Sequence, residues 1–152
     1  SFPTRRSSDL TKMDSSMQVP SCFCIKIRRI ASALTRLYDN ALAPCQITIS
    51  QYSLLCHIRS LPKSSIRVLS DATGLDRSTL ARNLRQLLKK GWVEDARAPG
   101  ARNCQLRLTA DGHALLAQAH PLWQQIQQQT SAIIDEQRLD VLNSLLIDIS
   151  AI

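Results

Sequence analysis

The sequence predicts a mainly α-helical fold that carries one small β-hairpin. Apolar residues recur three or four positions apart along most of the 152 residues, which is the spacing of helices with one buried face. The exception is residues 92–108, where apolar and polar residues alternate on both sides of a Pro99-Gly100 turn, as in two half-buried strands. With 44% hydrophobic and 20% charged residues the chain has a globular composition, and no apolar run is long enough to span a membrane.

Residues 67–109 contain two short helices separated by a tight turn. Val68, Leu69 and Ala72 give the first helix an apolar face, and Gly74 provides the left-handed residue that ends it. Asp76 then occupies the N-cap position of the second helix, where its carboxylate accepts a backbone N–H. This order is typical of a helix-turn-helix.

The second helix has one apolar and one basic face. Its leucines recur at helical spacing and are expected in the core: Leu80, Leu84, Leu87 and Leu88. Its polar face carries Arg77, Ser78, Thr79, Arg82, Asn83, Arg85 and Gln86. No acid follows Asp76 on this face, and arginine forks to guanine while asparagine or glutamine pairs with adenine. We therefore predict contacts to the phosphates and base edges of double-stranded DNA, the alternative being an ordinary solvated surface.

A basic hairpin follows the second helix. Trp92–Glu94 and Cys104–Leu108 are the expected strands, and Arg97 and Arg102 flank the tip of the loop between them. A basic loop beside a DNA-contacting helix is placed to contact the phosphate backbone or the adjacent minor groove. Together these elements follow the plan of a winged helix-turn-helix.

The chain resembles the MarR family of bacterial transcriptional regulators from about residue 22 to its C-terminus. The likeness rests on LTRLYDNALAP followed by ITISQYSLL, on GLDRSTLARNLRQLLKKGWVE, and on the Leu-Thr-x-x-Gly signature at Leu108, Thr109 and Gly112. The resemblance implies a homodimer, held by its first, fifth and sixth helices, that binds a pseudo-palindromic operator. One departure concerns the wing, where Gly100 replaces the aspartate that usually precedes Arg102 by two residues and pins it. A looser wing is the expected result.

The domain organisation follows from these elements. We expect residues 1–16 to be a non-native or disordered extension, and residues 17–152 to form one MarR-like domain. Within it, residues 17–46 and 110–152 would be the dimerisation helices and residues 47–109 the winged helix-turn-helix, with Pro121 at a kink or break. Residues 63–107 carry ten Lys/Arg against four Asp/Glu, whereas residues 108–152 carry one against five. A basic centre with an acidic C-terminal arm suits this division.

Cys22 and Cys24 are the candidate sensor residues among the five cysteines. They lie at the start of the first helix, where the helix dipole favours a reactive thiolate. The fourteen-residue interval from Cys24 to Tyr38 resembles the organic-hydroperoxide-sensing (OhrR-type) branch of the family, which implies a peroxide-sensing thiol with a tyrosine hydrogen-bonded to it. Two further tyrosines of that branch are replaced here by Arg28 and Ile49. The alternative is that both cysteines only pack at the dimer interface.

The leading prediction is a cytoplasmic, dimeric DNA-binding regulator. We expect it to act as a repressor that an oxidant or a small apolar or phenolic molecule releases from DNA. Two alternatives stay open: an architectural DNA-binding protein without regulated release, and a thiol- or metal-handling protein. The sequence has no GxGxxG, P-loop, HExxH or CxxC motif. We therefore expect no enzymatic activity, no cofactor and no metal.

Overall fold

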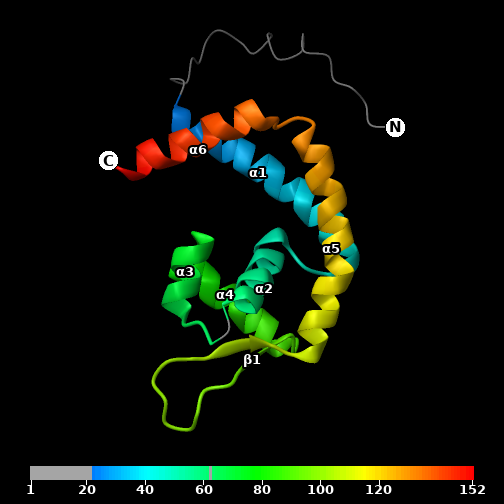
Figure 1. The fold of residues 1–152 in the computed structure, drawn as a ribbon, viewed down its shortest axis with the longest axis vertical. Helices are drawn as coiled ribbons and strands as arrows, with labels where there is room; N and C mark the ends of the chain where they lie inside the picture. The colour runs from blue at the N-terminus through cyan, green and yellow to red at the C-terminus, as the bar shows by residue number, and fades with distance from the viewer. Residues whose placement is uncertain (1–21, 62) are drawn as a thin grey trace, which may run out of the picture. The chain divides into compact units, whose positions relative to one another are not determined.

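The computed structural model describes residues 22–61 and 63–152, so the extension expected at residues 1–16 lies outside the described residues. The element order is α1 (Phe23–Leu42), the 3-10 helix η2 (Ala43–Cys45), α2 (Ile49–Ser60), α3 (Ile66–Thr73), α4 (Arg77–Lys89), β1 (Val93–Asp95), β2 (Leu106–Leu108), α5 (Ala110–Ser131) and α6 (Glu136–Ser150) (Figure 1). The predicted fold class, mainly α with a small β-hairpin wing, is confirmed. Among the described residues, no helix is both long and apolar enough to cross a membrane.

The chain divides into two units at residue 34, within α1. The described part of the first unit is a helical segment whose apolar side chains are exposed: Phe23, Ile25, Ile27 and Ile30. The second unit, residues 35–152, contains the hydrophobic core. Its fully buried large side chains are Leu42, Leu54, Leu55, Ile58, Leu69, Leu80, Leu87 and Leu106.

Helices α2, α3 and α4 pack on one another, and α2 and α4 also pack on the hairpin (Figure 1). The turn between α3 and α4 forms as the sequence predicts. Gly74 ends α3 with a φ of +67°, a backbone conformation that glycine adopts at little cost. Leu75 packs against the core, and Asp76 caps α4. The cap and the apolar plug together fix where α4 begins.

The two strands pair antiparallel with Val93 opposite Leu108 and Asp95 opposite Leu106. The first strand is shifted by one residue from the predicted Trp92–Glu94, and the second is shorter than the predicted Cys104–Leu108. Trp92 lies outside the ladder because its N–H donates to the Leu87 carbonyl and closes α4. The N–H of Gln105 donates to the Asp95 carboxylate instead of to a backbone carbonyl, so β2 begins only at Leu106.

The Leu-Thr-x-x-Gly signature joins the hairpin to α5. Thr109 caps α5: its hydroxyl accepts the Gly112 N–H at 3.1 Å and donates to the Gly91 carbonyl at 2.6 Å. The Thr109 N–H donates to the Trp92 carbonyl at 3.1 Å. A Cβ on Gly112 would lie only 2.0 Å from that same carbonyl oxygen. Only a glycine allows α5 to approach the first wing strand this closely.

Helix α5 runs through Pro121 without a break, contrary to one of the two expectations for that residue. Proline has no N–H to give to the carbonyl four residues earlier, that of Ala117. Both residues are exposed, so water is able to take the place of the missing donor. Helix α5 ends at Ser131, and Ile133 lies exposed in the turn that follows.

Candidate nucleic-acid interface

The start of α4 is fixed by the Asp76 carboxylate. It accepts the Thr79 N–H at 2.9 Å, the Ser78 hydroxyl at 2.5 Å and the Thr79 hydroxyl at 2.7 Å. These bonds, the Ser78 hydroxyl first, hold the pKa of Asp76 well below its usual range. The hydroxyl hydrogens of Ser78 and Thr79 are therefore used within the cap, which leaves their oxygens as acceptors toward any ligand.

The exposed face of α4 is cationic. Leu80, Leu84 and Leu87 are buried against the core, whereas Leu88, which the sequence also predicted there, is 39% exposed. The predicted contact residues on the other side are exposed, except that Thr79 and Asn83 are half-buried. Within the described ranges, no carboxylate pairs with any arginine of this helix, Arg77, Arg82 and Arg85. These three charges are therefore available to an anionic partner.

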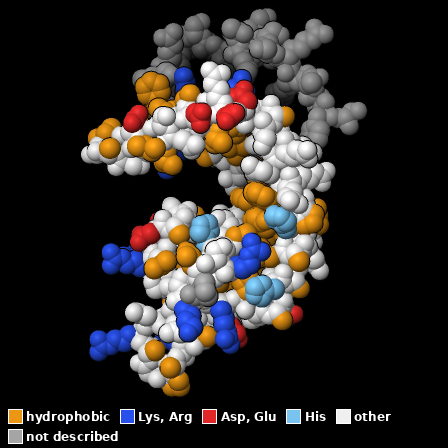
Figure 2. Space-filling view, viewed as in Figure 1, with side chains coloured by type: hydrophobic (Ala, Val, Ile, Leu, Met, Phe, Trp, Pro, Cys, Tyr) orange, Lys and Arg blue, Asp and Glu red, His pale blue; other side chains and the backbone are white. Residues whose placement is uncertain are grey.

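The charge distribution over the surface agrees with this assignment. Figure 2 shows Lys and Arg side chains over the helix-turn-helix and the hairpin, whereas Asp and Glu gather on α6. Helix α6 carries Glu136, Asp140 and Asp148. The basic surface thus coincides with the elements that a winged helix-turn-helix presents to nucleic acid.

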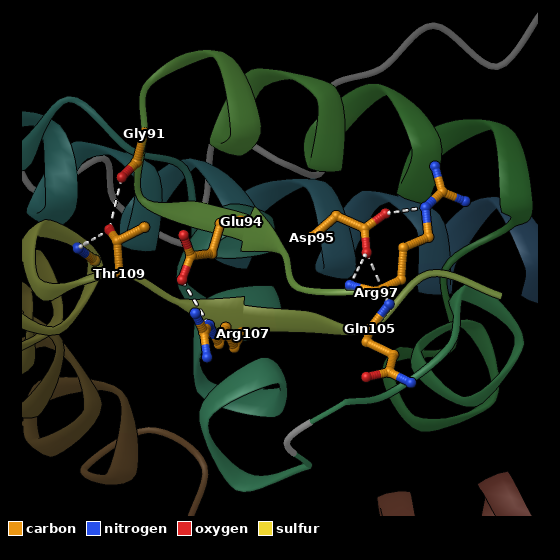
Figure 3. A network of polar contacts seen from close by, with 8 residues as sticks. Gly91, Glu94, Asp95, Arg97, Gln105, Arg107 and Thr109 are labelled. Carbon is orange, nitrogen blue, oxygen red and sulfur yellow. Dashed lines mark hydrogen bonds and ion pairs between the residues drawn. The ribbon is translucent and has the colours of Figure 1, made fainter. Parts of the chain in front are cut away.

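The Asp95 side chain connects the two sides of the hairpin at the base of the wing (Figure 3). The sequence analysis did not identify this residue. Its Oδ1 accepts the backbone N–H of Arg97 at 3.1 Å and that of Gln105 at 2.9 Å, so one carboxylate joins both sides of the hairpin. Its Oδ2 lies 3.0 Å from Nε of Arg97. The bond from Gln105, then that from Arg97 and its charge, lower the pKa of Asp95. The signal in the sequence was an aspartate two residues before an arginine.

Arg102 lies on the other side of the wing tip. It is exposed and has no carboxylate partner among the described residues, in keeping with Gly100 at the position that pins it in the family. The tip itself is a turn closed by the Ala101 N–H and the Ala98 carbonyl at 3.0 Å. The wing therefore holds one oriented arginine, Arg97, and one freely placed arginine, Arg102.

Replacing Asp95 by alanine should loosen the hairpin, because two backbone N–H groups lose their acceptor. We expect the amide protons of Arg97 and Gln105 to exchange several-fold faster with solvent, as measured by NMR. Since folding lowers the pKa of Asp95, its bonds should be fully present above the ordinary carboxyl range and be lost only as the pH falls through the lowered folded value.

The matched control is Glu94→Gln. Glu94 and Arg107 form an ion pair at 2.5 Å on the exposed face of the same hairpin, and exposed pairs of this kind contribute little to stability. Exchange at Gln105 should stay unchanged in this variant. Equal acceleration in both variants would mean that Asp95 acts only through general charge and not by bridging the strands.

The candidate sensor residues lie in different surroundings. Cys22 and Cys24 are exposed at the start of α1. Tyr38 is half-buried, and its hydroxyl donates to Oε1 of Gln127 on α5 at 2.5 Å. Of the other cysteines, Cys45 packs against the core at the end of η2. No group of three His, Cys, Asp or Glu in residues 22–61 and 63–152 is arranged to hold a metal ion.

A pocket of about 520 Å³ lies between α2, α5 and the C-terminal part of α1. Tyr38, Ile49, Tyr52, Ser53, Cys56, Arg59, His120, Trp123 and Gln127 line it. The rings of Tyr52 and His120 each stack on Trp123, with centroids 5.9 and 5.7 Å apart, and the Tyr52 hydroxyl lies 3.0 Å from Nδ1 of His120. Burial raises the pKa of Tyr52 to about 12 and also raises that of the Cys56 thiol. The sequence analysis did not identify this pocket, because its lining joins segments far apart in the chain.

Comparisons with known proteins point to one family. A model of the MarR family matches residues 46–102. The multiple antibiotic resistance protein MarR of Salmonella typhimurium is 37% identical over 86 residues, which are 56% of this chain and 60% of that protein. The chain thus spans about three-fifths of the length of the curated relatives it matches.

Solved structures extend the likeness over most of the chain. The M. tuberculosis transcriptional regulator MosR in complex with DNA matches with a TM-score of 0.72 and 34% identity, covering 86% of this chain and 98% of MosR. A mutant of MarR from E. coli complexed with operator DNA matches with a TM-score of 0.72 and 29% identity, covering 83% of this chain and 91% of that one.

Proposed function

Because this chain belongs to the MarR family, we propose that it is a DNA-binding transcriptional regulator whose helix α4 enters the major groove. The observation that carries the proposal is the exposed face of α4, where three arginines without carboxylate partners follow a fixed N-cap. A helix presented in this way matches the recognition helix of a winged helix-turn-helix. The DNA complexes of MosR and of E. coli MarR support it.

We propose that the wing adds contacts to the DNA backbone or minor groove. Arg97 is oriented by Asp95, and Arg102 is exposed near the tip. Contacts of this kind position a protein on DNA without selecting a sequence. Their loss should weaken binding to every duplex and flatten its dependence on salt.

A homodimer is the assembly that this function requires. Two recognition helices must reach successive major grooves of a pseudo-palindromic operator. Helix α6 leaves a row of large apolar side chains uncovered: Leu139, Leu142, Leu145, Leu146 and Ile149. Such a row supports burial against a second chain. We propose that the protein is cytoplasmic and that it regulates transcription by binding DNA and not by catalysis.

Arg82→Ala tests the central proposal. Arg82 lies in the middle of α4 on its exposed face, so it is placed to contact a base edge. We expect the variant to lose about 1–3 kcal/mol of binding free energy on a duplex selected from random DNA, and little on unrelated duplexes. Fluorescence anisotropy with the two duplexes measures both values.

Arg138→Gln provides the control for charge. It removes one positive charge from α6 and keeps a donor near the Ile133 carbonyl, which Arg138 contacts. Its binding to both duplexes should match that of the wild type. If Arg82→Ala loses the same binding free energy on both duplexes, Arg82 contacts the DNA phosphate backbone and not a base edge. A wild-type protein that selects no sequence at all would favour an architectural protein.

Two features support regulated release from DNA. The aromatic pocket next to α2 suits a small apolar or phenolic molecule, because stacked rings and the polar edges of Tyr52 and His120 line it together. The second feature is the exposed pair of thiols at Cys22 and Cys24, which is open to an oxidant. A ligand in the pocket and an oxidised Cys24 are separate signals, and variants of Cys24 distinguish them.

A further inference from the structure

Gln51 and Gln86 form a partly buried hydrogen bond between the N-terminus of α2 and helix α4. Nε2 of Gln51 lies 2.6 Å from Oε1 of Gln86. Gln51 is 8% exposed, whereas Gln86 lies on the exposed face of α4. The two residues are thirty-five positions apart in the chain. A buried side chain of α2 therefore donates a hydrogen bond to Gln86, one of the proposed DNA-contacting residues.

The orientation of both amides follows from one backbone group. Thr48 caps α2, and its N–H lies 3.1 Å from Oε1 of Gln51, while the Gln51 N–H donates to the Thr48 hydroxyl at 3.2 Å. A backbone N–H only donates, so the Gln51 atom facing it must be the oxygen. The Gln51 NH₂ group therefore faces Gln86. Because this group only donates, the Gln86 atom that it contacts must be the side-chain oxygen.

The position of the capping box is itself fixed. The N–H of Ile49 donates to Oδ1 of Asp39 on α1 at 2.7 Å, which ties the first turn of α2 to the end of α1. Both residues belong to the same unit of the chain as Gln51 and Gln86. The Thr48 N–H, held in place at the start of α2, leaves the Gln51 amide no equivalent flipped state. Turning it over would set two N–H groups against each other.

We propose that Gln51 is a positioning residue that makes Gln86 a donor-only contact to DNA. The Gln86 oxygen is taken by Gln51, and its NH₂ has no partner among the described residues. Such a group selects acceptors: O6 or N7 of guanine, N7 of adenine, O4 of thymine, or a phosphate oxygen, whereas cytosine offers it only a donor in the major groove. The paired contact to adenine that glutamine usually makes needs an outward oxygen, which would leave the buried Gln51 nitrogen without an acceptor.

The proposal rests on the proposed DNA-binding function, so its first test uses the protein without DNA. NMR of the side-chain NH₂ groups should show slow solvent exchange for Gln51 and fast exchange for Gln86. In Gln51→Glu, at mildly alkaline pH, the introduced carboxylate still accepts from Thr48 but no longer donates. Gln86 should then turn over, and its own NH₂ should become protected. Fast exchange of Gln86 in that variant would overturn the proposal even if the protein binds DNA as proposed.

The second test selects duplexes from a random library with wild type, Gln86→Met, Gln51→Met and Gln51→Glu. Gln86→Met should lose a preference of roughly two- to tenfold for guanine or thymine over cytosine at one position of each half-site, the size of one hydrogen bond. Gln51→Glu should shift that preference toward cytosine, which presents only an exocyclic amine donor in the major groove. Gln51→Met should broaden it, and this variant keeps the test available if a buried carboxylate prevents folding.

A base acceptor and a phosphate acceptor for the Gln86 NH₂ group give different results in this selection. If the acceptor is a phosphate, Gln86→Met and Gln51→Glu should weaken all duplexes alike and leave the selected sequence unchanged. Such a result supports the donor-only assignment with a backbone target. Binding and selection that are unaffected by Gln86→Met would remove Gln86 from the interface and overturn the proposal. A wild type that selects no DNA, with the expected NMR result, would instead refute the proposed function alone.

Discussion

Replacing Gly112 by alanine is expected to destabilise the protein by about 3 kcal/mol or more. In an ordinary helix, alanine is favoured over glycine by about 1 kcal/mol, so helix propensity alone predicts the opposite sign. The added methyl group would lie 2.0 Å from the Trp92 carbonyl oxygen and 3.0 Å from its carbon, and both are backbone atoms. To avoid this clash, α5 has to move away from the hairpin, and that movement breaks the Thr109 cap.

Thermal unfolding measures this effect. A loss of that size should lower the melting temperature by roughly 6–12 °C for a chain of this length. The protein concentration is kept constant, so that self-association contributes equally to both proteins. His113→Ala is the control, because His113 is the exposed neighbour of Gly112 on the same helix and its loss should change little. If Gly112→Ala melts at the wild-type temperature, the junction between the hairpin and α5 accommodates the added methyl group at little cost.

The local parts of the fold were predictable because local chemistry determines them. Gly74 ends a helix through its own backbone freedom, and Asp76 caps the next one within three residues. The alternation of residues 92–108 likewise predicted the hairpin, although the first strand is shifted by one residue and the second is shorter. The resemblance to the MarR family supplied the signature ending at Gly112, and the structure gives its physical reason.

The remaining features depend on contacts between segments far apart in the chain. Gln51 and Gln86 meet only after α2 packs on α4. Tyr38 appeared in the sequence as a partner for a thiol, but its hydroxyl donates to Gln127, eighty-nine residues away. Periodicity assigns each of these residues to a helix face and says nothing about the partner opposite. The candidate DNA contacts were therefore predictable as a set, whereas the polarity of Gln86 was not.

Treatment with a stoichiometric organic hydroperoxide should release the wild-type protein from its selected duplex and leave Cys24→Ser bound. The Cys24 thiolate attacks the terminal peroxide oxygen, so that an S–O bond forms, the O–O bond breaks and the alcohol leaves with a proton. The sulfur is oxidised by two electrons to a sulfenic acid, which condenses with a second thiol to a disulfide and water. The partner chain's Cys22 is a candidate for that thiol, because side chains two apart on one helix do not face each other.

The effect on DNA binding should be large, at least roughly tenfold in affinity, because both recognition helices must fit successive grooves together. A dithiol should restore binding. Cys22→Ser identifies the second thiol by the loss of the disulfide in mass spectra. Cys56→Ser is the matched control: this thiol is half-buried and burial raises its pKa, so it should react slowly and its loss should leave release unchanged. If Cys24→Ser dissociates as readily as the wild type, the thiol is not the sensor. The pocket between Tyr52, His120 and Trp123 then becomes the site where the signal acts.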